Sequence, residues 1–182
     1  IVVFDYNNDG WPDLLLCPDP GQFPRLLAAH ESIVPGSQTE LLIEIQISAP
    51  WHIYDPIILD TGLPTDIAFS VPDGVAIGVP RFPAPTLGES AGLEYLKHSG
   101  TIRVVAPLSL AADVEPGQTL TLQADVSGLA CIEACVPVKA SAALNLPVTA
   151  EPGAAANAPL FDTARQRLAQ FLGADPRRAR SP

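Results

Sequence analysis

Apolar and polar residues alternate along several short segments of the chain, and a period of two is typical of strands with one buried face. The clearest case runs from Glu40 to Ile47, where Leu41, Ile43, Ile45 and Ile47 are separated mostly by Glu and Gln. Similar patterns predict strands near 67–71, 75–79 and 101–106, with turns that contain proline or glycine between them. We therefore expect many short strands rather than helices.

Two more alternating segments flank a pair of cysteines, Cys131 and Cys135. Their apolar positions are Leu120, Leu122, Ala124 and Val126 before the pair, and Ala140, Ala142, Leu144 and Leu146 after it. The cysteines thus lie where two strands meet. Residues four apart on one extended strand are roughly 13 Å from each other, whereas a disulfide needs Cα atoms within about 7 Å. A bond between these two cysteines therefore requires a turn.

Composition supports an all-β class. The 182 residues include 20 prolines and 13 glycines spread between apolar runs, and this length suits one domain, or one domain plus a fragment. Residues 80–85 are too rich in proline for a central strand. Residues 89–99 carry no strand pattern and are predicted to be a loop.

A helix is predicted only near the end of the chain. Residues 149–159 form a predicted linker rich in alanine and proline, and the apolar positions that follow have helical spacing: Leu160, Ala164, Leu168, Phe171 and Leu172. We expect a helix over 160–173 with Gly173 as its C-cap, and a basic tail over 174–182. A helix that docks on the β-domain or frays in solvent fits this pattern better than one that binds a partner.

Charge limits the choice of partners. Ten basic and twenty acidic residues give a formal net charge of -10, and five of the basic residues fall in the last eighteen. An acidic body repels phosphate backbones, so we expect no nucleic-acid partner. No apolar run approaches the roughly 18 to 20 residues that span a bilayer, so we expect no transmembrane segment in this chain. The chain has no methionine and begins inside an apolar run, which predicts a processed or excised piece whose signal peptide is already missing.

The first residues carry a calcium-loop pattern. Oxygen side chains stand at loop positions 1, 3, 5 and 9, with Gly10 at position 6. An EF-hand needs a glutamate at position 12, where Leu16 stands, so the segment 1–17 resembles instead the short loop of an FG-GAP repeat in integrin-type propellers. That resemblance implies calcium bound by Asp5, Asn7, Asp9 and Asp13 and by the carbonyl of Trp11. A plain hairpin turn without an ion is the alternative. Cys17 is expected to be an unpaired thiol, ahead of a linker over 18–24.

The residues alone leave the role of the cysteine pair open. A disulfide that closes so short a loop removes little entropy from the unfolded chain and therefore stabilises the fold little. Exposed disulfides of this kind are also readily reduced. Zinc is disfavoured because a second pair of ligands is missing, but Cu(I) stays open. Glu133, between the cysteines, disfavours a thiolate by its charge. Thiol exchange, a structural bridge in a binding module and Cu(I) handling are therefore all retained.

The order of several short motifs adds a resemblance to a known family. The motifs are Trp51-His52-Ile53-Tyr54, Thr61-Gly62-Leu63-Pro64-Thr65, Val71-Pro72-Asp73-Gly74-Val75, Glu94-Tyr95, Pro116-Gly117 and Cys131-x-x-x-Cys135-x-Pro137. Over residues 25–148 the chain resembles the amino-terminal periplasmic domain of the thiol:disulfide interchange protein DsbD and its copper-tolerance relatives. Its two cysteines are closer together than in the best-known members.

The resemblance implies a fold, an activity and partners. It implies an immunoglobulin-like β-sandwich in the periplasm whose cysteines take electrons from a membrane donor and pass them to thioredoxin-like proteins, as a component of a thiol-disulfide oxidoreductase without a redox cofactor. It also implies that Cys135 attacks partners and that Leu93, Glu94 and Tyr95 cap the cysteines with an aromatic ring. His52 and Tyr54 are ranked below the cysteines, as packing residues.

Overall fold

The computed structural model describes residues 24–172 of the chain. The ten strands are β1 (Arg25–Ala28), β2 (Gln38–Ile47), β3 (His52–Tyr54), β4 (Asp66–Ser70), β5 (Val75–Ile77), β6 (Thr86–Ser90), β7 (Leu93–His98), β8 (Gly100–Leu110), β9 (Thr119–Cys131) and β10 (Cys135–Pro147), and they precede one helix, α1 (Ala158–Leu172). The predicted calcium loop, Cys17, the Gly173 cap and the basic tail lie outside the described residues.

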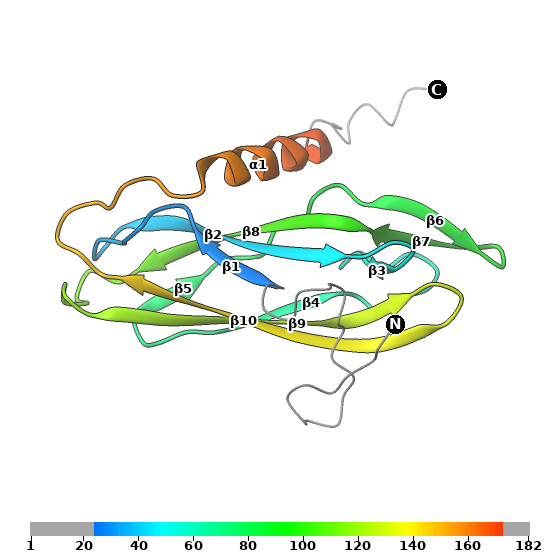
Figure 1. Cartoon of the computed structure of the whole chain (residues 1–182), viewed down its shortest axis with the longest axis horizontal. Helices are drawn as coiled ribbons and strands as arrows, with labels where there is room; N and C mark the ends of the chain where they lie inside the picture. Colours follow the sequence, from blue (N-terminus) through cyan, green and yellow to red (C-terminus); the bar gives the residue numbers. More distant parts are fainter. Residues whose placement is uncertain (1–23, 173–182) are drawn as a thin grey trace, which may run out of the picture.

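The strands form two antiparallel sheets that face each other (Figure 1). One sheet has the order β1-β2-β8-β5, and the other has the order β10-β9-β3-β7-β6, with β4 also paired to β9. The predicted all-β class is confirmed, and the fold is an immunoglobulin-like β-sandwich. In Figure 1 the turn between β9 and β10 lies at the same end of the molecule as β6 and β7.

The alternating positions form the core between the sheets, as the sequence pattern predicts. Leu41 and Ile43 on β2 are fully buried against the opposite sheet, where Leu122 and Ala124 on β9 are fully buried as well. Strands β9 and β10 pair residue for residue along thirteen positions each. Because both strands alternate through this length, their odd-numbered side chains point away from the core.

Strand β2 is buried on both faces, because α1 covers its outer side (Figure 1). Leu42 and Val105 on the outer face of the four-stranded sheet pack with Phe161, Ala164 and Leu168 of the helix. The predicted helix is confirmed. Among the helix side chains that the structure describes, the largest buried one is Phe161, 1% exposed, rather than the neighbouring Leu160. Phe161 also fits the helical spacing to Ala164 and Leu168, three and seven residues further on.

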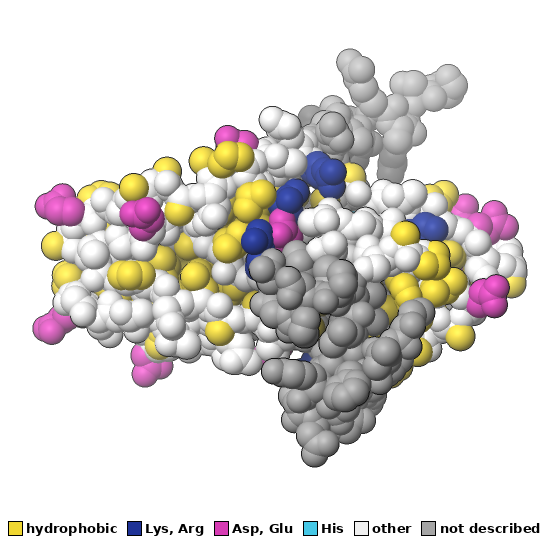
Figure 2. Space-filling view, in the orientation of Figure 1, with side chains coloured by type: hydrophobic (Ala, Val, Ile, Leu, Met, Phe, Trp, Pro, Cys, Tyr) yellow, Lys and Arg dark blue, Asp and Glu magenta, His cyan; other side chains and the backbone are white. Residues whose placement is uncertain are grey.

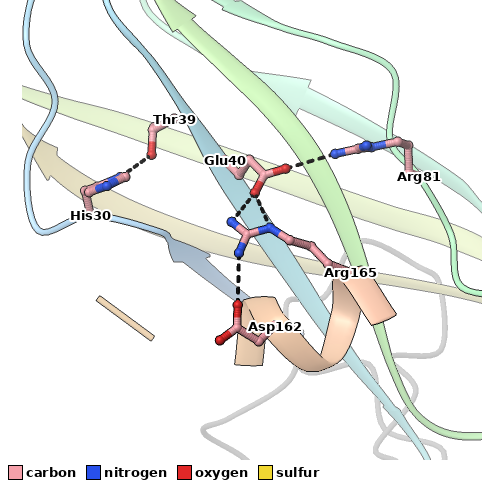
Figure 3. Close-up of polar contacts among 6 residues, drawn as sticks. All are labelled: His30, Thr39, Glu40, Arg81, Asp162 and Arg165. Atoms are coloured by element: carbon pink, nitrogen blue, oxygen red, sulfur yellow. Dashed lines mark hydrogen bonds and ion pairs between the residues drawn. The ribbon is translucent and has the colours of Figure 1, made fainter. Parts of the chain in front are cut away.

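A polar cluster at the edge of this contact ties the helix to the sheet (Figure 3). The Glu40 carboxylate on β2 accepts hydrogen bonds from Arg165 of α1 at 3.0 and 2.5 Å, and from Arg81 at 2.9 Å. Arg165 also donates to Asp162 at 3.2 Å. The hydrogen bond that Arg165 donates to Glu40 raises the pKa of Arg165 above its ordinary value. Helix, sheet and the proline-rich segment around Arg81 thus share one carboxylate.

The segment predicted as a linker, 149–159, pairs with the chain ahead of β2. The amide of Glu31 donates to the carbonyl of Ala154 at 3.0 Å, and the amide of Ala156 donates to Ala29 at 2.8 Å. The Asn157 side chain donates to the carbonyl of Ala28 at 3.1 Å. These bonds bring the helix back onto the outer face of the sheet.

The prediction of a loop over 89–99 is wrong, because most of this segment belongs to the hairpin β6–β7. Its two-residue turn is Ala91-Gly92, with φ values of 52° and 80°. A turn of this kind needs φ above zero at both positions, and Asn-Gly is its usual signal. Alanine at the first position hides the turn from the sequence, and the largely exposed strands β6 and β7 lack a clear alternation.

None of the described helical residues forms a segment that is both long and apolar enough to cross a membrane.

Candidate functional site

Cys131 and Cys135 form a disulfide across the tip of the hairpin β9–β10. Cys131 ends β9 and Cys135 begins β10, the two are directly paired, and their Cα atoms are 4.1 Å apart. Between them the chain turns over three residues, and the amide of Ile132 donates to the carbonyl of Ala134 at 3.2 Å. The turn that the sequence requires for a bond between these residues is therefore present.

The two sulfur-bearing residues differ in exposure. Cys131 is 2% exposed, whereas Cys135 is exposed to solvent. Thiol exchange proceeds by attack of a thiolate along the disulfide, so the sulfur that can be approached decides the reaction. By exposure, Cys135 is therefore the more accessible of the two cysteines.

The burial of Cys131 is unusual because its side chain points away from the core. Its neighbour Ala130 is fully buried in the core between the sheets, so Cys131 lies on the outer face of the six-stranded sheet. His52 on β3 is paired with Cys131, and Tyr54, two residues on, is paired with Lys97 of β7. Register therefore places cystine and aromatic side chains on one outer face.

Three rings form a cluster that covers this part of the face. His52 and Tyr95 are stacked, with ring centroids 5.5 Å apart and planes 16° from parallel. Tyr54 meets both edge-on, at 5.8 Å from His52 and 5.4 Å from Tyr95. The Tyr54 hydroxyl lies 3.8 Å from the sulfur of Cys135, within hydrogen-bonding range for sulfur. The cluster thus contacts the disulfide through Tyr54.

Electrostatics in the cluster favour a neutral imidazole. Burial lowers the pKa of His52, and the positive charge of Lys97 lowers it further. The ammonium group of Lys97 also lies 5.9 Å from the centroid of the Tyr95 ring. Neutral His52 is therefore the form next to Cys131 at neutral pH.

The three residues predicted to cap the cysteines have different surroundings. Tyr95 is 8% exposed and belongs to the ring cluster. Leu93 is 46% exposed, and Glu94 is exposed with its backbone bonded to Asp60: the Glu94 amide donates to the Asp60 carboxylate at 2.9 Å, and the Asp60 amide donates to the Glu94 carbonyl at 3.1 Å. Tyr95 thus supplies the ring, and Glu94 joins its hairpin to the loop after β3.

Sequence reasoning ranked Tyr54 and His52 as packing residues and did not predict that they lie beside the cysteine pair. Both stand on one face of a short strand, two residues apart, and this spacing was the available signal. What it lacked was the register of β3 against β9, which joins residues about eighty positions apart. Glu133 lies exposed in the turn between the cysteines. Within residues 24–172, no three His, Cys, Asp or Glu side chains are grouped as a metal site would need.

These features define a class of domain: a β-sandwich that carries a disulfide with one exposed and one buried cysteine, beside a cluster of aromatic rings. The family model described as "Thiol:disulfide interchange protein DsbD, N-terminal" matches residues 23–147. The chain belongs to this family, as the resemblance in the sequence predicts.

The solved structures that are similar to the chain include two domains of this kind. The N-terminal periplasmic domain of ScsB from Proteus mirabilis matches with a TM-score of 0.55 and 19% identity, over 79% of this chain and 52% of that one. The chain thus spans about half the length of that relative, and the likeness supports the fold. The reduced DsbD N-terminal domain of Neisseria meningitidis aligns with a TM-score of 0.43 and 13% identity, over 76% of this chain and 96% of that one. No curated protein sequence matches.

Proposed function

We propose that this domain is an extracytoplasmic dithiol carrier that exchanges electrons through Cys131 and Cys135. The observation that carries the proposal is the difference between the two cysteines, one exposed beside the Tyr54 hydroxyl and one buried. Membership of the DsbD N-terminal family supports it. An exposed sulfur for attack and a sheltered sulfur for resolution are what two-step exchange requires.

The reaction consists of two balanced exchanges. A donor thiolate attacks the sulfur of Cys135, the bond to Cys131 breaks, and Cys131 leaves as a thiolate that takes up a proton. The second donor thiol, as thiolate, attacks the mixed disulfide and releases Cys135. The donor dithiol has become a disulfide, and this domain has gained two electrons and two protons.

Electrons leave by the same steps in reverse order. The Cys135 thiolate attacks an acceptor disulfide, and Cys131 resolves the mixed disulfide, so the bond between the two cysteines forms again. Family membership supports thioredoxin-like acceptors, a membrane electron donor and a location outside the cytoplasm. The exchange needs no cofactor, because the two sulfurs hold both electrons.

The alternative of a purely structural bridge has less support. The disulfide joins residues four apart at the end of a ladder of thirteen paired positions. Closing so short a loop constrains the unfolded chain little, and the ladder already holds these ends together. A redox role explains the position of the bridge better than a stabilising one.

The reduction potential of the pair tests the proposal. The Cys17→Ser variant is equilibrated in glutathione or dithiothreitol buffers, and the fraction of Cys131–Cys135 bond is read by mass spectrometry. We expect a potential above roughly -300 mV with fast exchange, as in disulfides that are catalytic rather than structural. A lower potential with slow reduction contradicts the proposal and favours a binding module.

A binding measurement tests the alternative that the cysteine pair handles Cu(I). The reduced protein is compared with the Cys131→Ser/Cys135→Ser variant in a competition assay for Cu(I). Binding of Cu(I) by the reduced protein that is no tighter than binding by the double-serine variant removes the copper alternative. Tighter binding by the reduced pair supports the copper alternative, since thiolates are preferred ligands for Cu(I).

A further inference from the structure

Gly88 on β6 lies directly beneath the ring of Tyr95. The two residues are paired across the hairpin β6–β7, so both lie on the outer face of the sheet. A Cβ atom added at Gly88 would lie 2.6 Å from both Cε2 and Cζ of Tyr95 and 3.0 Å from its hydroxyl oxygen. Carbon atoms do not approach so closely, so the present position of the ring requires glycine here.

The second tyrosine of the cluster rests on a glycine in the same way. A Cβ atom at Gly62 would lie 2.6 Å from Cδ1 of Tyr54. Gly62 has a φ of 119°, so its backbone also favours glycine, and a substitution there would mix two effects. Gly88 is not among the glycines with positive φ. Replacing Gly88 therefore tests the ring contact alone.

The ring of Tyr95 is the part that would move. All three atoms that the added Cβ would meet lie at the far end of the Tyr95 side chain, and none is backbone. Rotation of this ring relieves the clash without changing the hairpin. The rotated ring loses its stack on His52 and its edge contact with Tyr54, the residue whose hydroxyl meets Cys135.

We propose that Gly88 is a positioning residue for the redox site: it lets the Tyr95 ring lie flat on the sheet, where the ring shields the disulfide through His52 and Tyr54. The relevance of Gly88 to thiol exchange rests on the proposed function of the domain. The physical claim itself concerns how far the ring cluster limits access to Cys131 and Cys135. Gly88 acts through Tyr95 and does not touch the sulfurs.

The test compares Gly88→Ala with wild type in the Cys17→Ser background. The rate of alkylation of the reduced cysteines by iodoacetamide is expected to rise about two- to tenfold, the factor that corresponds to the loss of an aromatic pair contact. Leu87→Ala is the matched control, because Leu87 is the adjacent residue of β6, points to the opposite side and is 56% exposed. It is expected to leave the rate unchanged.

A double-variant cycle assigns the effect to the ring. In a Tyr95→Ala background the added methyl group meets no ring, so Gly88→Ala is expected to have no further effect on alkylation. An unchanged rate in Gly88→Ala alone, or an equal acceleration with and without Tyr95, overturns the proposal. Failure of Gly88→Ala to fold overturns it as well, because the ring would then not be the part that yields.

His52 gives a readout that does not depend on redox activity. Displacing the Tyr95 ring exposes the imidazole, so in Gly88→Ala the pKa of His52 is expected to rise toward its ordinary value when followed by NMR titration. Slow reduction of the Cys131–Cys135 bond in wild type would contradict the proposed function. The alkylation rates and the His52 titration would still measure the effect of Gly88 on the ring cluster. The two failures are therefore distinguishable.

Discussion

At the scale of single residues, Tyr54 is the side chain whose contact with the cystine is most direct. Its hydroxyl lies 3.8 Å from the sulfur of Cys135, while its ring is held between Tyr95 and Gly62. After reduction the same hydroxyl can donate to a thiolate, and a hydrogen bond to the charged form of a group lowers its pKa. Tyr54 is thus placed to set how much Cys135 is ionised.

Tyr54→Phe removes this donor and keeps the ring. We expect the pKa of the Cys135 thiol to rise and its alkylation at neutral pH to slow by about three- to tenfold, which corresponds to roughly 0.7 to 1.4 kcal/mol for one hydrogen bond near the surface. The measurement is the pH dependence of alkylation of the reduced protein. A pH profile that does not move would show that the hydroxyl makes no bond to the thiolate.

His52 makes stability depend on pH with a definite sign. Burial, with help from Lys97, lowers the pKa of His52 in the folded protein, while the unfolded chain keeps the ordinary value of about 6.5. Between the two values the unfolded state binds more protons, so this contribution to stability is complete above about pH 6.5 and is lost as pH falls through the lowered pKa.

The comparison with His52→Gln isolates that contribution. Urea unfolding of both proteins at pH 7.5 and pH 5.5 should show a larger loss of unfolding free energy on acidification in wild type than in the variant. Equal losses in the two proteins would mean that His52 titrates normally. Lys97→Gln should raise the pKa of His52 in an NMR titration, because one of the two causes of its depression is gone.

At the scale of elements, two kinds of contact hold α1 on the sheet. Phe161 is 1% exposed within an apolar cluster, and Arg165 forms a partly exposed ion pair with Glu40. Buried aromatic contacts contribute far more to stability than exposed ion pairs, which compete with water. The apolar contact should therefore dominate.

Phe161→Ala is expected to lower the free energy of unfolding by about 3 to 5 kcal/mol, and Glu40→Gln by at most about 1 kcal/mol. Urea denaturation measures both, and Gln166→Ala on the exposed side of α1 is the control. Comparable losses for Phe161→Ala and Glu40→Gln would show that the polar cluster, rather than the apolar one, holds the helix.

Elements with regular patterns could be predicted from the sequence, and the others could not. Strands β2, β9 and β10 show period-two alternation because one face of each meets the core, and the turn at the cysteines follows from chain geometry. The hairpin β6–β7 was missed because its turn uses Ala91 and its strands are largely exposed. The cysteines were found by spacing, but the ring cluster depends on register between distant strands.

At the scale of the whole molecule, the folded unit extends past the family match, which ends at residue 147. Segment 149–157 pairs with the chain before β2, and α1 buries Leu42 and Val105, which are otherwise the outer surface of a sheet. Both side chains are fully buried, and they pack against the helix. Apolar surface of this kind promotes association when it is uncovered.

A chain ended at residue 148 is therefore expected to be less stable and to self-associate. The control is a chain ended at residue 172, which keeps α1. Light scattering and binding of a hydrophobic dye should distinguish the two proteins, with more association and more dye bound by the shorter one. Equal behaviour would show that the sandwich folds and stays monomeric without its helix.

Acidic and basic side chains are concentrated in different parts of the molecular surface. On the face shown in Figure 2, acidic side chains gather at both ends of the long axis, and apolar side chains are exposed at the end where β6 and β7 lie. Basic side chains on this face lie mostly beside the helix. On this face, the end at which the β9–β10 turn lies presents apolar and acidic side chains together.

The position of the disulfide at the very tip of the β9–β10 ladder has a consequence for how the domain can be recognised. We expect that opening the bond frees two side chains and leaves the paired positions behind them intact, so that the oxidised and reduced proteins share nearly the whole of their surface. A partner that touches the domain elsewhere would then not distinguish the oxidised from the reduced protein. A partner that binds only one of the two redox states would therefore have to contact the surface immediately around Cys135.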